Sequence, residues 1–537
     1  MEFSILIGGE AGDGVKQAGV IIAKIFNELG YHVFVYDDYQ SLVRGGHNFS
    51  IVRVSDDKIY THDDFVNLII ALNQDTIDKH SWRLKENGKI IFDSDKSKAD
   101  GVGISATTWA REKGSLLLRN SVFIGAMCKY FGIELEIAKD IIKKSFKRMI
   151  DENQEALDFG YNSLEKNHDV KKIGPPRKIL TGNEAVALGA VGAGLKIYIA
   201  YPMTPSTSIL HFLAAKEDEL GVVTVQAENE ISVANMAVGA AFAGARAMVG
   251  TSGGGLALMG ETISLCSMSE TPVLFVNSQR AGPSTGIPTY TMQADLNFVL
   301  NIGHGDVTKI TIAPGDIEEA YYLAAKAMNL VWKYQVPGIL LIDKHISEST
   351  SSAELNEVKK IEPKLWDGKG EYKRYLLTED GISPLAFPGQ IVGVKGSSYE
   401  HDEGGITIEE EVDLIAKMQE KRLRKMEKLR EELKNEETVK VYGNPNSDVV
   451  ILTWGSTKGA CVEVAKELNL KVVQPIFLEP MPTWELKKHL EGKRVIGVEC
   501  NATGQLSNIL GIKEKILKYD GRPFTPNELK KKLEEIL

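Results

Sequence analysis

The stretch "FSILIGGEAGDGVKQAGVIIAKIFNELGYHVFVYDD", from Phe3 to Asp38, determines the fold class that we expect for this chain. It begins with an apolar run of strand length and a glycine-rich loop. Apolar residues then recur at the spacing of an amphipathic helix, and a second apolar run follows. This order predicts a βαβ unit, and therefore an α/β fold.

The glycine-rich loop "GGEAGDG", residues 8–14, suggests a phosphate site, because small residues before a helix let backbone N–H groups approach an anion. The dinucleotide fingerprint requires a third glycine after Gly12 and Gly14, and the chain has Gln17 there. We therefore expect a tight strand-to-helix turn, and nucleotide binding remains the alternative.

The composition is typical of a protein with several globular domains. The chain has 537 residues, of which 43% are hydrophobic and 25% charged. A formal net charge of −10 argues against nucleic acid or an anionic membrane as the main partner. No apolar run reaches the roughly 18 residues of a membrane span. Met1 leads directly into an apolar strand without a basic leader, so we expect a cytoplasmic protein.

A second α/β domain is expected after the proline-bearing segment 171–178, "KKIGPPRK". Five apolar runs alternate with helical patterns and predict a parallel sheet covered on both faces: "LKIYIA" (195–200), "VVTVQAE" (222–228), "ARAMVGT" (245–251), "TPVLFVN" (271–277) and "PGILLID" (337–343).

The remaining third of the chain predicts a linker and a smaller α/β domain. Residues 409–435 are strongly charged with one apolar stripe, which predicts a solvated linker helix. A βαβ-like unit follows in "DVVILTWGS" (448–456), "LKVVQPIF" (470–477) and "KRVIGVECN" (493–501). The expected division of the chain is 1–172, 173–346, 347–440 and 441–537.

The segment "YPMTPSTS", residues 201–208, directly follows an apolar strand. Pro202 and Pro205 restrict φ and remove two backbone donors, so the segment must be an irregular loop. One interpretation is a polar turn that caps the next helix. The alternative is a stiff loop that presents Thr204 to a ligand.

Two carboxylates, Glu228 and Glu230, stand between an apolar run and a helix rich in alanine and glycine. They could simply stabilise the helix N-terminus, or one of them could do chemistry. The loop "TSGGG", residues 251–255, permits close approach to a flat ligand or another chain.

Arg280 lies in the loop "NSQRAGPSTGIPTYTMQAD", residues 277–295, after another predicted strand. Open α/β sheets bind ligands at the carboxyl ends of their strands. An arginine surrounded by small polar residues could clamp a carboxylate or phosphate, or it could be purely structural.

Taken together, these motifs resemble the 2-oxoacid:ferredoxin oxidoreductase family, specifically a chain that fuses the gamma and alpha portions. "YPMTPSTS" is similar to the YPITP loop of the family, with Met203 in place of isoleucine. The other similar blocks, in family order, are "GGEAGDGV" (8–15), "VRGGHNFS" (43–50), "AENEIS" (227–232), "RAGPSTGIPT" (280–289), "SYEHDEGGIT" (398–407) and "ECNATGQL" (499–506).

The resemblance implies three α/β domains: a gamma domain, a pyrimidine-type thiamine diphosphate domain and a transketolase C-terminal-like domain. It implies that Glu230 is the catalytic carboxylate that hydrogen-bonds N1′ of the thiamine pyrimidine. It further implies that Thr204 and Arg280 bind the 2-oxoacid. Cofactor contacts are expected from Tyr201, Pro202, Glu230, Ser252 and Gly253.

The resemblance also implies partners. The family reaction is the coenzyme A-dependent oxidative decarboxylation of a 2-oxoacid with reduction of ferredoxin. This chain lacks the magnesium–diphosphate motif, and its four cysteines lie too far apart for a [4Fe–4S] motif. The family places both in a separate beta subunit, so the resemblance implies that Mg²⁺, the cluster and half of the thiamine diphosphate site belong to such a partner. We expect no metal ligands in this chain.

The substrate stays open between pyruvate, 2-oxoglutarate and branched-chain 2-oxoacids, because a carboxylate clamp serves all of them equally. Fusion of the gamma and alpha portions favours 2-oxoglutarate or a broad range, by analogy only. An indolepyruvate-type oxidoreductase and a non-catalytic nucleotide-binding scaffold are the alternative functions.

Overall fold

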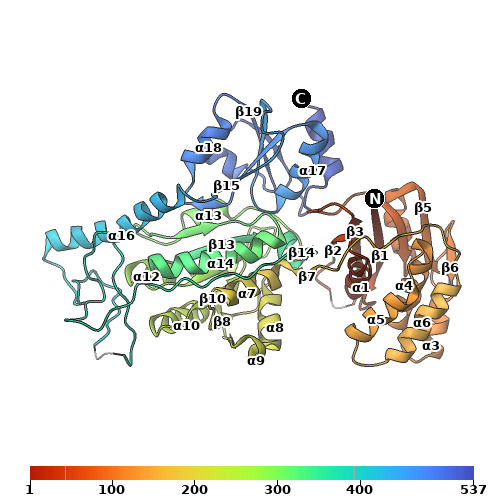
Figure 1. Ribbon diagram of the computed structural model, residues 1–537, viewed down its shortest axis with the longest axis horizontal. Helices are drawn as coiled ribbons and strands as arrows, with labels where there is room; N and C mark the ends of the chain where they lie inside the picture. The colour runs from red at the N-terminus through yellow and green to blue at the C-terminus, as the bar shows by residue number, and fades with distance from the viewer. Residues whose placement is uncertain (43, 391–392) are drawn as a thin grey trace. The chain divides into compact units, whose positions relative to one another are not determined.

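Three β-sheets with helices packed on them form the framework of the protein in the computed structural model (Figure 1), which describes residues 1–42, 44–390 and 393–537. Val43, the first residue of "VRGGHNFS", and residues 391–392, in the expected linker 347–440, lie outside the described residues. The chain divides into two compact units, each described by itself. Unit 1 comprises Met1–Thr181, Glu348–Glu354 and Thr525–Glu535, and unit 2 comprises Gly182–Ser347, Leu355–Phe524 and Ile536–Leu537.

Unit 1 contains an eight-stranded mixed sheet in the order β6-β5-β4-β1-β3-β2-β14-β7. Its strands are β1 (Glu2–Ala11), β2 (His32–Asp38), β3 (Gly45–Ser55), β4 (Val66–Ala71), β5 (Leu84–Asp93), β6 (Val102–Ile104), β7 (Lys178–Thr181) and β14 (Thr350–Ala353). Its helices are α1 (Val15–Glu28), α2 (Gln74–His80), η1 (Ser81–Arg83), α3 (Ala106–Glu112), α4 (Leu118–Phe131), α5 (Leu135–Ser145), α6 (Ile150–Asn162) and α20 (Pro526–Glu534).

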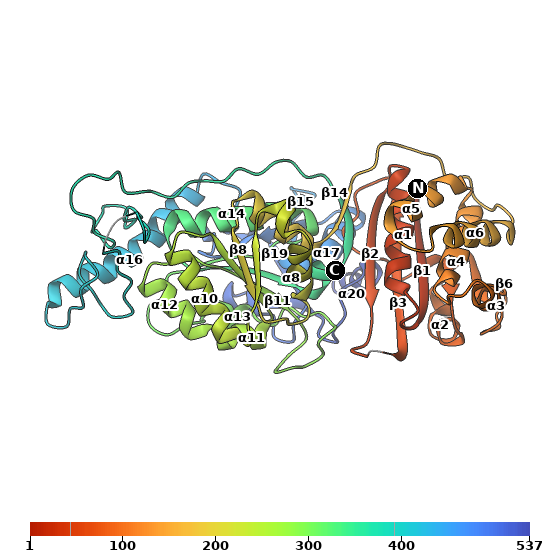
Figure 2. The same ribbon diagram turned by 90° about the horizontal axis from the view of Figure 1, so that it is seen from below.

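The predicted βαβ opening is present, but a strand is inserted into it. β3 lies between β1 and β2 and pairs antiparallel with both, so β1 and β2 are parallel without being neighbours (Figure 2). Alternate residues of these strands enter two cores, with Ile5 and Val33 on the α1 face and Leu6 and Phe34 on the other. This alternation holds the register, because a shift by one residue would move every apolar side chain to the opposite face.

Unit 2 contains a seven-stranded sheet in the order β18-β12-β13-β11-β10-β8-β9, in which only β18 is antiparallel to its neighbour. Its strands are β8 (Ile197–Ala200), β9 (Val223–Gln226), β10 (Ala247–Thr251), β11 (Leu274–Gln279), β12 (Ile310–Ile312), β13 (Gly338–Asp343) and β18 (Phe477–Glu479). The five strands predicted here are all present, which confirms the parallel α/β arrangement.

A second sheet of unit 2 has the order β15-β17-β16-β19-β20, with β15 (Val439–Gly443), β16 (Val449–Leu452), β17 (Lys471–Pro475), β19 (Arg494–Glu499) and β20 (Glu514–Leu517). The helices of unit 2 are α7 (Gly182–Gly192), α8 (Thr207–Ala215), α9 (Glu217–Leu220), α10 (Glu230–Phe242), α11 (Gly253–Leu258), α12 (Gly260–Met268), α13 (Leu296–Leu300), α14 (Ile317–Tyr334), α15 (Lys344–Glu348), α16 (Val412–Leu433), η2 (Gly455–Thr457), α17 (Lys458–Leu468), α18 (Thr483–Leu490) and α19 (Gln505–Ile509).

The charged helix differs from the prediction. The predicted helix is present as α16, but it is not fully solvated, because Lys421 and Lys425 are completely buried. Both ammonium groups contact the buried carboxylate of Glu270, at 2.6 and 2.5 Å. Glu270 lies 151 positions from Lys421 in the sequence. It stabilises the burial of this helix face, since a buried charge requires a partner.

In the part of the chain that the structure describes, none of the helices is both long enough and apolar enough to cross a membrane.

Candidate active site

Four neighbouring strands of the large sheet in unit 2 end at the motifs that the sequence singled out. In the order β11, β10, β8 and β9, their carboxyl ends lead into Arg280, the "TSGGG" loop, the "YPMTPSTS" loop and the Glu228–Glu230 segment. The four strands are parallel, so these ends lie on one edge of the sheet. This is the edge at which open α/β sheets bind ligands.

The loop after β8 is irregular, as predicted. Ser206 stands at the N-cap position of α8, but its hydroxyl donates to the carbonyl oxygen of Met203 (2.8 Å) instead of capping the helix. The buried amide of Asn183 donates to the carbonyl oxygen of Pro205 (2.8 Å), and the Thr204–Pro205 bond is cis. These contacts hold the loop from both sides, so it is positioned before any ligand arrives.

Arg280 and Thr204, 76 residues apart in the sequence, are in direct contact. The Arg280 guanidinium donates to the backbone carbonyl oxygen of Thr204 at 2.9 Å. Burial lowers the pKa of Arg280, an effect that nearby Asp295 opposes. The structure therefore brings the two predicted substrate-binding residues together.

Asp295 is a site residue that the sequence analysis did not single out, although it ends the quoted segment 277–295. Its carboxylate accepts a hydrogen bond from the Asn277 amide (3.1 Å), and its backbone N–H donates to Gln279 (3.0 Å). Burial raises the pKa of Asp295, while Asn277 and Arg280 favour the charged form. In the sequence, only its position as a charged residue at the end of a glycine-containing loop could have indicated Asp295 as a site residue.

A cavity of about 320 Å³ lies beside this group and is lined by Ser252, Gly253, Gly254, Ala257, Arg280, Gly282, Pro283, Ser284, Asp295 and Phe298. A Cβ on Gly253 would meet Asp295 at 2.5 Å, whereas one on Gly254 would meet no atom within 4 Å. Glycine at 253 is thus needed for close packing. Glycine at 254 leaves a face open to a ligand or another chain.

Glu228 and Glu230 have different environments. Glu228 is exposed and accepts from the Ser232 hydroxyl (2.9 Å). Glu230 is only 5% exposed, at the first turn of α10. A Cβ on Gly255 would lie 2.9 Å from its carboxylate oxygen Oε1. The buried carboxylate therefore packs against the helix that begins at the open glycine loop.

Of the described residues predicted to form the site, only Ser252, Gly253 and Arg280 line the cavity. Tyr201 is 40% exposed at the start of its loop, and Pro202 is half-buried next to it. Met203 connects this loop to the glycine loop, through a 3.9 Å contact of its sulfur with the Thr251 hydroxyl.

The glycine loop of unit 1 turns between β1 and α1, with Gly12 and Gly14 in the left-handed region (φ 100° and 78°). The Asp13 carboxylate accepts from the backbone N–H of Glu10 (2.9 Å) and from the Arg119 guanidinium (2.7 Å). A carboxylate of the chain therefore occupies a backbone donor that a phosphate would need. This arrangement favours the tight-turn interpretation of the loop.

Comparisons with known proteins identify the family to which the chain belongs. Residues 188–421 match the family model described as pyruvate flavodoxin/ferredoxin oxidoreductase, thiamine diphosphate-binding, and residues 4–163 match that of pyruvate ferredoxin/flavodoxin oxidoreductase. The 2-oxoacid:ferredoxin oxidoreductase subunit alpha of a Sulfolobus species is 31% identical, over 100% of this chain and 97% of the relative. The 2-oxoglutarate synthase subunit KorA of Methanocaldococcus jannaschii is 30% identical, over 60% of this chain and 88% of its own length.

A solved structure is similar along nearly the whole chain. It is the 2-oxoglutarate:ferredoxin oxidoreductase from Magnetococcus marinus with 2-oxoglutarate, coenzyme A and succinyl-CoA bound. It has a TM-score of 0.90 and 31% sequence identity, and the match covers 99% of both chains. The predicted family and the multidomain α/β fold are thereby confirmed. This chain belongs to the 2-oxoacid:ferredoxin oxidoreductases, as an alpha subunit with a fused gamma domain.

Proposed function

We propose that this chain provides the substrate-binding half of a thiamine diphosphate site, at which a 2-oxoacid is oxidatively decarboxylated with coenzyme A and ferredoxin. A separate beta subunit provides the other half. The observation that carries this proposal is the contact of Arg280, which lines the glycine-lined cavity, with the Thr204 carbonyl oxygen. A guanidinium in the lining of such a cavity suits the carboxylate that every 2-oxoacid carries.

The residues present suit one side of the cofactor. Ser252 lines the cavity, and its Oγ is buried without a hydrogen-bond partner among the described residues, so this hydroxyl is available to a bound group. Gly254 leaves room for a flat ring, and Glu230 supplies a buried carboxylate behind the same loop. We assign cofactor contacts to Tyr201, Pro202, Glu230, Ser252 and Gly253.

Each of these side chains has a distinct task in the proposed reaction. Thiamine diphosphate, when bound, supplies the carbon nucleophile that attacks the 2-oxo carbon and accepts the electron pair released with CO₂. Glu230 acts by sharing a proton with N1′ of the pyrimidine ring, which makes the neighbouring amino nitrogen a base. Arg280 holds the substrate carboxylate, and the Thr204 hydroxyl donates to the substrate.

The surface next to the cavity supports docking of a second subunit. Apolar side chains are exposed around the open Gly254, namely Ile231 and Met236 on α10, Leu258 on α11 and Phe298 on α13. Exposed apolar residues grouped around a half-site are typical of a protein interface. We assign the beta subunit to this surface, and we assign to that subunit the Mg²⁺, the [4Fe–4S] cluster and the route to ferredoxin.

We propose 2-oxoglutarate as the first substrate to test and pyruvate as the second, in a cytoplasmic enzyme that has no nucleic acid or membrane partner. The similarity to two enzymes that are named for 2-oxoglutarate supports this order. Coenzyme A is the proposed acyl acceptor, because the same solved structure holds it together with succinyl-CoA.

The test is to purify the chain together with its beta subunit and to measure coenzyme A-dependent viologen reduction with each 2-oxoacid. We expect activity from the complex and none from this chain alone. Activity of the lone chain, or a complex that reduces viologen without coenzyme A or thiamine diphosphate, would contradict the shared-site proposal.

A further inference from the structure

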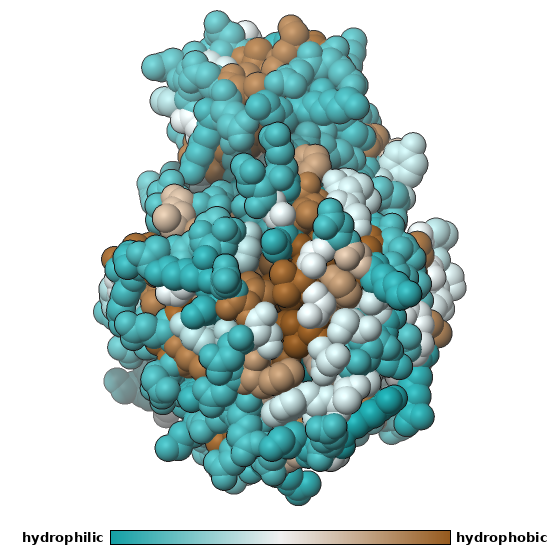
Figure 3. Space-filling view, turned by 90° about the vertical axis from the view of Figure 1, so that its right-hand side faces the viewer, coloured by the Kyte–Doolittle hydropathy of each residue, from teal (hydrophilic) through white to brown (hydrophobic). Residues whose placement is uncertain are grey.

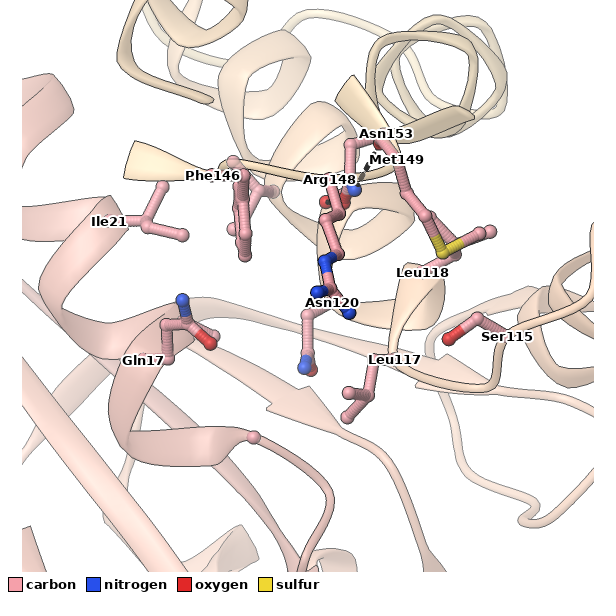
Figure 4. A pocket seen from close by; sticks show the side chains of 14 residues that line it. Gln17, Ile21, Ser115, Leu117, Leu118, Asn120, Phe146, Arg148, Met149 and Asn153 are labelled. Carbon is pink, nitrogen blue, oxygen red and sulfur yellow. Dashed lines mark hydrogen bonds between the residues drawn. The ribbon is translucent and has the colours of Figure 1, made fainter. Parts of the chain in front are cut away.

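A separate pocket of about 170 Å³ lies within unit 1, between α1, α4 and the connection from α5 to α6 (Figure 4). Most of its lining is apolar and comes from Ala18, Ile21, Leu117, Leu118, Ile124, Phe146 and Met149. Its volume is close to that of an apolar cavity of about 150 Å³ that holds benzene. None of the residues assigned to the thiamine diphosphate site lines this pocket.

Polar groups occupy one part of the lining. Figure 4 shows Arg148 extending from the α5–α6 connection toward Asn120, with Gln17 on the opposite side of the space. Arg148 is an exposed residue at the edge of the lining, and among the described residues its guanidinium has no ion pair or hydrogen-bond partner. A cation beside an apolar pocket without a protein carboxylate in its lining suits an anionic ligand.

Asn120 adds a second requirement for the chemistry of the ligand. Its Nδ2 donates to the backbone carbonyl oxygen of Asp13 at 2.7 Å, which defines the orientation of the amide. Its Oδ1 is therefore an acceptor, and it is buried without a partner among the described residues. A ligand that satisfies this oxygen must carry a hydrogen-bond donor close to its anionic group.

The backbone that carries Arg148 is held in an uncommon conformation. The next residue, Met149, has a φ of 53°, in the left-handed region that non-glycine residues rarely adopt. The Asn153 amide donates to the Met149 carbonyl oxygen (2.6 Å) and accepts from the Ser121 hydroxyl (2.6 Å). Strained conformations braced by side chains are found at ligand sites more often than elsewhere.

The mouth of the pocket is accessible. Leu117 and Met149 in its lining are 55% and 36% exposed, and neighbouring Leu116 is also exposed. Figure 3 shows that hydrophobic residues also gather near the middle of the molecular face that it presents, within a hydrophilic surround. Exposed leucines at the entrance favour a ligand with an apolar tail.

We propose that this pocket binds a small aliphatic 2-hydroxy acid, for which 2-hydroxyhexanoate is the probe. Arg148 receives the carboxylate, the ligand hydroxyl donates to Asn120 Oδ1, and the aliphatic tail lies against Ile21, Phe146 and Leu118. A monoanion matches the single guanidinium. A phosphate dianion would bring excess charge beside an apolar wall.

The experiment is a titration of 2-hydroxyhexanoate into the full alpha–beta complex, followed by saturation-transfer NMR. The complex carries Arg280→Ala, which weakens binding of the probe's carboxylate in the substrate cavity. We expect a Kd of about 1 mM or tighter. Arg148→Met should weaken binding about tenfold or more, because it removes a charge-assisted hydrogen bond, whereas neighbouring Lys147→Met should leave the Kd unchanged.

Two related probes test the other contacts. Hexanoate lacks the hydroxyl and should bind several-fold more weakly, and glycolate lacks the tail and should bind weakest. Saturable binding of 2-hydroxyhexanoate that is insensitive to Arg148→Met, or no binding at all, would overturn the proposal. Displacement of the probe by coenzyme A would also overturn it, since the pocket would then belong to the acyl-acceptor site.

Discussion

The Arg280 guanidinium donates a 2.9 Å hydrogen bond to the backbone carbonyl oxygen of Thr204. This contact leaves the hydroxyl of Thr204 and the remaining guanidinium N–H groups available to a substrate. It also ties the loop after β8 to the end of β11, so the two residues act as one clamp.

Replacing Arg280 should therefore weaken substrate binding. We expect Arg280→Ala to lower kcat/KM for the 2-oxoacid by about 10- to 100-fold, mainly through KM, because a charge-assisted hydrogen bond is lost. Steady-state kinetics of the alpha–beta complex measure this, with the exposed Arg111→Ala as control. An unchanged KM would remove Arg280 from the substrate site.

Thr204 contacts Arg280 through its backbone, so its side chain can be tested separately. Thr204→Val keeps the shape and the clamp, and it should raise KM about 2- to 10-fold through loss of one neutral hydrogen bond. Thr207→Val, at the first residue of the following helix α8, is the control. If both variants behave alike, the Thr204 hydroxyl has no specific role.

Glu230 and Glu228 form a natural pair for testing the catalytic carboxylate. Glu230→Gln should lower kcat about 100-fold or more and leave the complex assembled, because general acid–base assistance is lost. Glu228→Gln should change kcat less than about twofold, since Glu228 is exposed. Size-exclusion chromatography checks assembly, and equal effects of the two substitutions would exclude the proposed proton-sharing role.

The buried ion cluster of α16 predicts that loss of its single carboxylate lowers the free energy of unfolding more than loss of one of its cations. Glu270 faces Lys421, Lys425 and Arg374, and Lys421 alone makes two hydrogen bonds to it, of 2.6 and 2.8 Å. Glu270→Gln should cost about 3–5 kcal/mol, because it leaves buried cations without a counter-charge.

Removing one cation from the same cluster should be milder. Burial lowers the pKa of Lys425 to about 7, so its charge is already disfavoured in the folded protein. Lys425→Met should therefore cost about 1 kcal/mol or less. Chemical denaturation of the two variants gives both free energies of unfolding, and equal losses would show that the Glu270 carboxylate is not the dominant member of the cluster.

A buried histidine pair in unit 1 predicts a pH dependence of local stability. His47 Nε2 and His80 Nε2 are 2.7 Å apart, and Arg83 donates to His80 Nδ1 (3.3 Å), so His80 Nε2–H donates to His47. Burial, with the neighbouring positive groups, lowers the pKa of both imidazoles, that of His80 to about 3.

The direction of the pH dependence follows from the number of protons that the folded and unfolded chains bind. The unfolded chain protonates His80 below its usual pKa near 6.5, whereas the folded chain does so only near pH 3. The protection of β3 and α2 amides against hydrogen exchange should therefore fall as the pH is lowered from about 6.5 toward 3. His80→Gln should flatten this profile, and an unaltered slope in that variant would assign the effect to other groups.

The sequence predicted most of the repetitive structure. The apolar runs of β8, β10, β11 and β13 have the composition of strands buried on both faces, and this property depends on local residues only. The run of β9 is also a strand, but it lies at the sheet edge and is partly exposed. The inserted β3 was missed, because antiparallel pairing between residues 32–38 and 45–55 depends on neighbours and not on composition. The buried face of α16 was missed for a similar reason, since Glu270 is its partner and lies far away in the sequence.

The sequence by itself determined the parallel α/β class, the stiff loop at Thr204 and the chemical types of the candidate residues. The spacing of apolar residues, the prolines and the glycines each restrict the backbone locally, so their effect can be predicted without the fold. Only the tertiary structure decided which residues meet. It brought Arg280 to Thr204, added Asp295 beside them, and buried Glu230 while leaving Glu228 exposed. Parallel strand order places distant loops on one edge of a sheet, and that order is a property of the whole fold.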